Sequence, residues 1–115
     1  MNERIQTKTT DGIALWTLNR PERRNALDRA TVQALYDLAL RAAKDPALRA
    51  VVITGAGEHA FCAGADLKER IGLASIEVAA LLDAYRKAFD AIDSLPIPVV
   101  AALNGSALGG GLELA

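Results

Sequence analysis

The N-terminal part of the chain carries the hydrophobic pattern of a hairpin. Residues 4–10 (RIQTKTT) alternate weakly between apolar and polar side chains, and residues 13–18 (IALWTL) form a mainly apolar run. Between them stands Asp11-Gly12, a pair typical of a tight hairpin turn. The pattern therefore predicts two paired strands, and Trp16 is expected to pack in the core or in an interface.

Two later segments show the three- and four-residue spacing of amphipathic helices. Asp28 is placed to cap the first helix, which should end before Pro46 and bury Val32, Leu35, Tyr36, Ala39 and Ala43. Ser75 is placed to cap the second helix, whose expected buried stripe comprises Val78, Leu81, Leu82, Tyr85, Phe89 and Ile92.

Three further apolar runs have the length of strands. Residues 50–54 and 98–103 are predicted to be buried strands, and residues 61–63 form a shorter run. Because a strand, a helix and another strand follow one another, we expect a right-handed crossover and a sheet covered by helices. The predicted class is α/β, in the order β-β-α-β-α-β, with a last helix beginning at residues 112–115.

Two corners of small residues follow apolar strands, at residues 62–66 (CAGAD) and residues 107–111 (ALGGG). If strands 50–54 and 98–103 lie side by side, both corners emerge near one sheet edge, where α/β proteins usually place their sites. Glycines expose main-chain N–H groups, and an N–H at a helix start favours negative charge. Two such N–H groups could bind one oxygen atom, with Glu113 close by. The alternative is a plain strand-to-helix corner with a solvated glutamate.

Composition narrows the class of protein without identifying it. The chain has 115 residues, half of them hydrophobic, and a net charge of −1, which suits one ordinary domain and gives no basic excess for nucleic acid. Its apolar runs are too short to span a membrane, and no signal-peptide core is evident. Cys62 and His59 are the only residues of their types, so we expect no disulfide, no metal site and a cytoplasmic location. Cys62 is interpreted as a core residue and His59 as a surface turn residue.

Three segments together resemble the successive signatures of the crotonase family, the enoyl-CoA hydratases and isomerases. They are LNRPERRNALD (residues 18–28), FCAGADLKE (residues 61–69) and NGSALGGGLELA (residues 104–115), in the family's order. The resemblance covers essentially the whole chain. It implies a crotonase-like spiral of ββα units, of which residues 1–115 form the N-terminal part, without the C-terminal helical part and without the second glutamate of family hydratases.

The resemblance also implies roles for individual residues. The amides of Ala65 and Gly110 would hold the thioester oxygen, and Glu113 would be the catalytic glutamate. The residues implied to contact coenzyme A or the acyl group are Arg23, Arg24, Ala26, Ala63, Ala65, Asp66, Leu67, Lys68, Gly109 and Gly110. Simpler interpretations stay open: Asp66 as a helix cap, Lys68 and Glu69 as a solvated pair, and Arg23 and Arg24 as surface charge.

The implied function is addition of water to a 2-enoyl-CoA, in which coenzyme A belongs to the substrate and no separate cofactor or metal is required. The acyl-CoA thioester would be the ligand, and the family likeness implies a trimer or a hexamer. One alternative is an enoyl-CoA isomerase or another acyl-CoA enzyme of the family. Another is a non-catalytic fragment that binds a partner chain or CoA only. Dinucleotide binding at Gly109-Gly110-Gly111 is disfavoured, because the G-x-G-x-x-G spacing is absent.

Overall fold

Most of the predicted elements form within residues 3–115, which the computed structural model describes apart from the side chain of Leu112. The strands are β1 (Ile5–Thr10), β2 (Ile13–Leu18), β3 (Ala50–Gly55), β4 (Ala60–Cys62), β5 (Val99–Ala102) and β6 (Ser106–Ala107). The helices are the short 3-10 turn η1 (Pro21–Arg23), α1 (Arg29–Ala43), α2 (Leu67–Arg70), α3 (Ser75–Asp93) and α4 (Gly110–Leu114).

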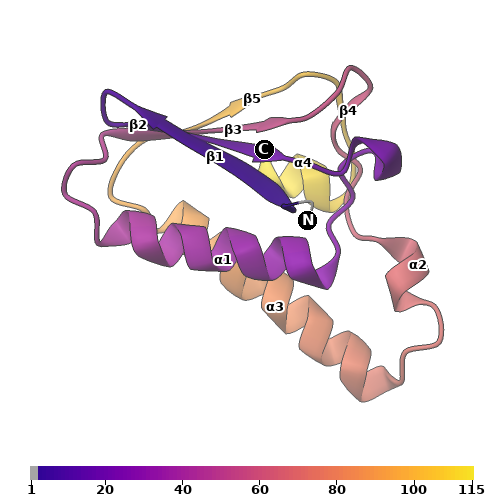
Figure 1. The fold of residues 1–115 in the computed structure, drawn as a ribbon. Coiled ribbons are helices and arrows are strands. Elements are labelled where there is room, and N and C mark those ends of the chain that lie inside the picture. The colour runs from indigo at the N-terminus through magenta and orange to yellow at the C-terminus, as the bar shows by residue number, and fades with distance from the viewer. Residues whose placement is uncertain (1–2) are drawn as a thin grey trace.

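The main sheet has the strand order β1-β2-β3-β5. β1 and β2 pair antiparallel around Asp11 and Gly12, both at positive φ, so the predicted hairpin is confirmed. β2, β3 and β5 run parallel, which confirms that residues 50–54 lie beside the last strand run. Helices α1 and α3 lie together on one side of this sheet (Figure 1). The carboxyl ends of the parallel strands therefore share one edge.

The core lies between the sheet and the two long helices. Alternate residues of β2 and β3 face it, and Ala14, Trp16, Leu18, Val51 and Ile53 are all buried. The expectation for Trp16 is confirmed. Across from them α1 contributes Val32, Leu35, Ala39 and Ala42. No helix within residues 3–115 combines the length and the hydropathy that crossing a bilayer would need.

The start of α1 was predicted correctly, whereas the start of α3 was not. Asp28 caps α1, since its Oδ1 accepts a hydrogen bond from the Thr31 N–H at 2.9 Å. Ala74 rather than Ser75 precedes α3, and the Ala74 N–H donates to Glu77 Oε1 at 3.3 Å. Ser75 is the first helical residue. The Glu77 carboxylate thus accepts the N–H of the N-cap residue itself, whereas a serine cap would accept from an N–H further into the helix.

Both predicted helical stripes contain one wrong residue. Ala43 is exposed, and the neighbouring Ala42 is buried in its place, together with Thr31. Leu82 is 49% exposed, while Ala88 is fully buried. The stripes differ because α1 and α3 pack against each other, and the rotation of each helix about its axis decides which of two neighbouring residues is covered.

The run 98–103 is not a buried strand as expected. β5 is the edge strand of the main sheet, and Val100 and Leu103 are 52% and 57% exposed. Only Val99 and Ala101, on the face toward the helices, pack against the core. Apolar composition alone does not show whether both faces of a strand are covered, and here the described residues cover one.

Two asparagines shape the loop between β3 and β4. The buried Asn25 side chain accepts from the Arg20 N–H at 2.9 Å and donates to the carbonyls of Ala56 (3.0 Å) and Ala60 (2.8 Å). Asn104 accepts from the Gly55 N–H at 3.1 Å and also donates to Ala60 at 3.0 Å. The loop is thus held from both sides by amide groups from distant parts of the chain.

We expect Asn25→Ala to lower the free energy of unfolding by about 3 kcal/mol, since the Arg20 N–H and the Ala56 carbonyl lose this partner and the Ala60 carbonyl keeps only its bond from Asn104. Asn25 has a positive φ of 56°, which alanine adopts less readily than glycine. Asn25→Gly therefore tests whether the stability loss comes from the missing hydrogen bonds or from backbone strain. If the bonds dominate, glycine should lose almost as much as alanine in urea unfolding. Gln33→Ala, which removes one exposed bond to Asp37, should change stability by less than about 0.5 kcal/mol.

Candidate functional site

The two small-residue corners meet near the carboxyl edge of the parallel strands (Figure 1). The first corner, residues 62–66, follows β4, and the second, residues 107–111, follows β6. β4 and β6 pair in parallel, and the Leu108 N–H donates to the Cys62 carbonyl at 3.1 Å. The structure therefore brings the corners together as the sequence predicts.

Glycine allows this close approach of backbone to backbone. A Cβ on Gly111 would overlap the Cys62 carbonyl, and one on Gly64, whose φ is +94°, would lie 2.8 Å from the Leu108 carbonyl oxygen. At Gly110 the nearest atoms would be 3.7 Å away, an ordinary contact. Gly64 and Gly111 are thus required by packing at the junction of the corners.

The Ala65 amide is left without a backbone acceptor by the way its corner is held. Leu27 and Ala65 form an isolated parallel β-bridge. The Leu27 N–H donates to Gly64 O at 2.7 Å, and the Asp66 N–H donates to Leu27 O at 3.0 Å. These bonds flank Ala65, whose own N–H has no acceptor in residues 3–115. A bridged residue's remaining N–H faces the opposite side from its partner strand.

The Gly110 amide lies beside that of Ala65. Gly110 is the first residue of α4, and the first N–H groups of a helix have no partner within it. α4 thus begins two residues earlier than the predicted residues 112–115. A methyl group on Gly110 would lie 3.8 Å from the Ala65 nitrogen, so the two amides are neighbours. Two adjacent N–H donors can bind one oxygen that carries partial negative charge.

A cavity of about 430 Å³ opens in front of these two amides. Its lining includes Ala65, Gly110 and Glu113, which the sequence had singled out, and its other residues are Leu27, Arg70, Leu82, Tyr85, Arg86, Phe89 and Asp90. α3 therefore supplies one wall and the two corners supply the other. The cavity combines apolar surface with a few charged groups, as is usual for small-molecule sites.

Tyr85 supports the first corner through its hydroxyl group, which the sequence-based prediction missed. The hydroxyl donates to the Leu27 carbonyl at 2.8 Å, the same oxygen that receives the Asp66 N–H. Burial, with a contribution from the Glu69 carboxylate, raises the pKa of Tyr85 to about 12, so the hydroxyl stays protonated and can donate. Its helical spacing indicated only a core residue, because the acceptor is a backbone atom far along the chain.

Arg20 is a second residue whose role was missed. Although it lies in a loop of charged residues, it is 9% exposed, and its Nη1 donates to Ala26 O at 3.0 Å and to Asp66 Oδ2 at 3.1 Å. The same nitrogen lies 3.5 Å from Asp28 Oδ2. Asp66 in turn caps α2 by accepting from the Lys68 N–H at 3.1 Å. The helix-cap interpretation of Asp66 is therefore the one the structure displays.

The other predicted contact residues lie outside the cavity. Arg23, Arg24, Leu67, Lys68 and Gly109 are exposed, and Ala26 and Ala63 are half-buried. Their two segments are neighbours, because the Ala63 N–H donates to Arg24 O at 3.0 Å. The loop of residues 23–27 thus lies along the first corner.

The side chains of Cys62 and His59 lie where the sequence predicts. Cys62 is buried, and burial raises the pKa of its thiol against the opposing effect of a hydrogen bond from the Gly64 backbone. His59 is exposed in the loop before β4. In the described part of the chain no three His, Cys, Asp or Glu side chains gather closely enough to hold a metal ion.

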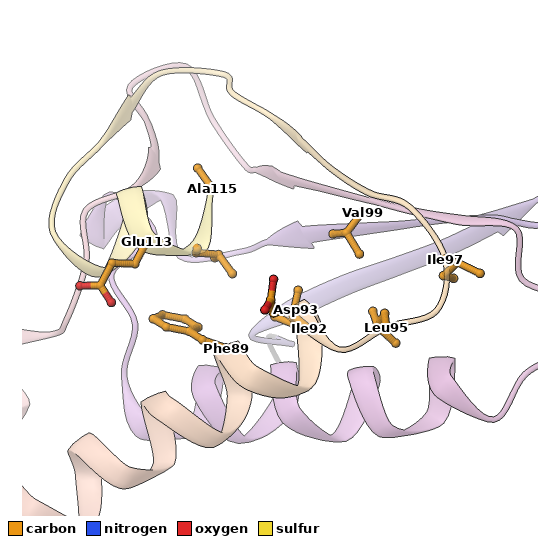
Figure 2. A pocket seen from close by; sticks show the side chains of 9 residues that line it. Phe89, Ile92, Asp93, Leu95, Ile97, Val99, Glu113 and Ala115 are labelled. Atoms are coloured by element: carbon orange, nitrogen blue, oxygen red, sulfur yellow. The ribbon is translucent and has the colours of Figure 1, made fainter.

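A second cavity of about 300 Å³ lies next to the first. Figure 2 shows Phe89 and Glu113 at one end of it, with Leu95 and Ile97 at the other. Phe89 and Glu113 line both cavities. Glu113 therefore stands between the two cavities.

The glycine contacts lead to a paired prediction. Gly111→Ala should unfold the protein or lower its stability by at least about 3 kcal/mol, because the added methyl group overlaps the Cys62 carbonyl of an adjacent backbone segment. Gly110→Ala meets no atom closer than 3.7 Å and should keep a near-native thermal midpoint. Equal midpoints for the two variants would contradict the described packing of the corners.

Asp66 leads to a pH-dependent prediction. Burial alone would raise the pKa of its carboxyl group, but the Arg20 guanidinium and the Glu69 and Lys68 amides outweigh burial and hold that pKa below its ordinary value. Its bonds therefore stabilise the folded state above the unfolded-state pKa and lose this effect as pH falls through the lower folded-state pKa. Asp66→Asn should cost about 2 kcal/mol at pH 7, and the cost should shrink toward pH 3. A constant difference, like that expected for the exposed Asp37→Asn, would contradict this role.

Comparison with known proteins places this geometry in a family. A family model described as enoyl-CoA hydratase/isomerase matches residues 8–115. YngF of Bacillus subtilis is 47% identical over 109 residues, which cover 95% of this chain and 42% of YngF. The crotonyl-CoA hydratase of Syntrophomonas wolfei is 37% identical over 113 residues, covering 98% of this chain and 44% of that protein.

Solved structures agree with the sequence relatives. The crystal structure of an enoyl-CoA hydratase from Bacillus anthracis superposes with a TM-score of 0.94 at 40% identity and covers 97% of this chain but 44% of its own. The chain thus spans about two fifths of the length of the relatives it matches. The chain has the crotonase fold, of which it covers part. The chain belongs to the enoyl-CoA hydratase/isomerase family.

Proposed function

We propose that this chain provides the thioester-binding part of an enzyme that adds water to a 2-enoyl-CoA. The observation that carries the proposal is that the Ala65 and Gly110 amides and the Glu113 side chain belong to one cavity. Family membership supports it, as does a relative named for crotonyl-CoA, which is itself a 2-enoyl thioester. Because the chain spans about two fifths of such relatives, the activity is proposed for the complete protein that contains it.

The two amides would act as an oxyanion hole. In the ground state the thioester oxygen carries little charge, but it becomes enolate-like when a nucleophile adds to the β-carbon. Donors that are already oriented toward that oxygen stabilise the transition state more than the substrate, which is the condition for catalysis. Losing one such donor typically costs about 3 kcal/mol of transition-state stabilisation.

Glu113 would orient the attacking water and accept a proton from it. The water oxygen would bond to the β-carbon, and a proton would be delivered to the α-carbon, so that H and OH add across the double bond. Glu113 lies in the first turn of α4, three residues after Gly110, and both residues line the same cavity.

Coenzyme A would lie along the first corner and the loop beside it. Ala63, Ala65, Asp66 and Leu67 would line its adenine part, with Lys68 nearby, and Arg23, Arg24 and Ala26 would meet its pantetheine and phosphates. The exposed arginines support this assignment because flexible cations can neutralise phosphate charge without a fixed geometry. The partly buried hydrogen bond from Arg20 to Asp66 indicates that Asp66 also has a structural role.

An enoyl-CoA isomerase is the second candidate, because the matching family model covers both activities. The two would share the amide pair and differ in the acids and bases around it. Hydration consumes the conjugated double bond of a 2-enoyl-CoA, whereas isomerisation of a 3-enoyl-CoA creates it, so the absorbance of the conjugated thioester changes in opposite directions.

We expect Glu113→Gln to reduce the rate of crotonyl-CoA hydration by about 100-fold or more, because the amide cannot accept the proton. Glu58→Gln, at an exposed loop residue, is the matched control and should keep the normal rate. The measurement is the decrease in absorbance of the conjugated thioester, using the protein as its gene encodes it. A normal rate in Glu113→Gln would exclude this role, and conversion of 3-enoyl-CoA without hydration would favour the isomerase.

A further inference from the structure

One hydroxyl group joins the cavity wall formed by α3 to the backbone of the first corner. The Tyr85 hydroxyl donates to Leu27 O at 2.8 Å. Among residues 3–115 this is the only side-chain hydrogen bond that α3 makes to another element. Apolar packing has no preferred direction, whereas a hydrogen bond specifies both distance and angle. The bond from Tyr85 therefore fixes how the backbone of the corner lies against α3.

The residue that Tyr85 holds sets the direction of the Ala65 amide. The Leu27 N–H donates to Gly64 O at 2.7 Å, and Leu27 O also accepts from the Asp66 N–H at 3.0 Å. The peptide that joins Gly64 to Ala65 is trans and planar, so its C=O and its N–H point in opposite directions. Because Leu27 holds the Gly64 oxygen, the Ala65 N–H points away from Leu27. A shift of Leu27 would therefore turn this N–H.

The Tyr85 hydroxyl acts on the cavity through the backbone rather than by direct proton donation. A phenol has one proton, and Leu27 O already accepts it. Burial and the Glu69 carboxylate raise the pKa of Tyr85 to about 12, which keeps that proton in place. Leu27 is 1% exposed and Tyr85 is half-buried, so bulk water is a poor substitute for this donor.

We propose that Tyr85 is a positioning residue for the amide pair, because by holding Leu27 it aims the Ala65 N–H at the thioester oxygen. This rests on the proposed function, since it takes that oxygen to lie at Ala65 and Gly110. A hydrogen bond weakens steeply when its N–H is misaligned. The weakening matters most where the oxygen carries most charge, which is in the transition state. Loss of the hydroxyl should therefore slow the reaction more than it weakens substrate binding.

The first test measures hydration of crotonyl-CoA by Tyr85→Phe, in the protein as its gene encodes it. This change removes the hydroxyl and keeps the ring, and Leu27 O retains the Asp66 N–H, so the fold should persist. We expect kcat to fall about tenfold while KM changes by less than about twofold. Tyr36→Phe is the matched control. Tyr36 is half-buried on α1, its hydroxyl has no side-chain hydrogen bond within residues 3–115, and both constants should stay at their wild-type values.

The second test measures the amide pair by infrared spectroscopy with butyryl-CoA, a saturated thioester that cannot be hydrated. An isotope label at the thioester carbonyl separates its stretching band from those of the protein. Binding to the wild type should lower the frequency of this band, because hydrogen bonds to the oxygen weaken the C=O bond. Tyr85→Phe should lose at least about half of this shift, because one of the two donors is misaligned, and Tyr36→Phe should keep it. A merely structural role would lower the thermal midpoint and leave the band of the bound ligand unchanged.

Two results would overturn the positioning role and leave the proposed function intact. They are a wild-type rate and band in Tyr85→Phe, and a lower kcat with an unchanged band, which would mean that Tyr85 acts by another route. If the wild type shifts the band but hydrates no crotonyl-CoA, the hydratase is rejected, and loss of the shift in Tyr85→Phe still supports the positioning role. A wild type that leaves the band of butyryl-CoA unshifted would reject the amide pair and the positioning role together.

Discussion

The buried guanidinium group of Arg20 joins the parts of the chain on which the candidate site depends. Asp28 starts α1 and Asp66 starts α2, and both carboxylates lie within 3.5 Å of one nitrogen of this side chain. Each carboxylate also accepts from backbone amides of the helix it caps, so the charges are shared between ion pairs and caps. A buried cation with two such partners is compensated, whereas removing Arg20 would leave the Asp66 carboxylate without an ion pair. The loop of residues 20–28 and the corner of residues 62–66 are therefore held in one arrangement.

The site itself is made mainly of backbone, and its side chains act by leaving room or by holding backbone in place. Gly64 and Gly111 allow the two corners to touch, and Leu27 occupies the backbone groups on both sides of Ala65. Tyr85 then holds the Leu27 carbonyl from the opposite wall. An amide donor placed in this way needs no rearrangement when charge develops on a ligand, and this is the property that an oxyanion site requires.

One face of helix α3 packs in the core, and an adjacent face lines the cavity. Leu81, Ala88 and Ile92 are buried, while Leu82, Tyr85, Arg86 and Phe89 line the cavity beside the corners. This division explains why Leu82 is half exposed in spite of its hydrophobic character. A helix that carries apolar residues on two adjacent faces gives a broad stripe in the sequence, and the stripe alone does not tell a core face from a ligand-facing one.

The sequence by itself determined the features whose causes are local. The Asp11-Gly12 turn, the Asp28 cap and the two glycine-rich corners each depend on residues within a few positions of one another, and the order of strand, helix and strand follows from the succession of such local patterns along the chain. Only the tertiary structure decided which surfaces are covered and which distant groups meet. It placed Arg20 inside, gave Tyr85 a backbone acceptor, moved the start of α4 to Gly110, and left β5 exposed at the sheet edge. The physical reason is that a side chain's burial and hydrogen-bond partners are properties of the assembled layers, whereas turns and caps satisfy the backbone within one or two turns of chain.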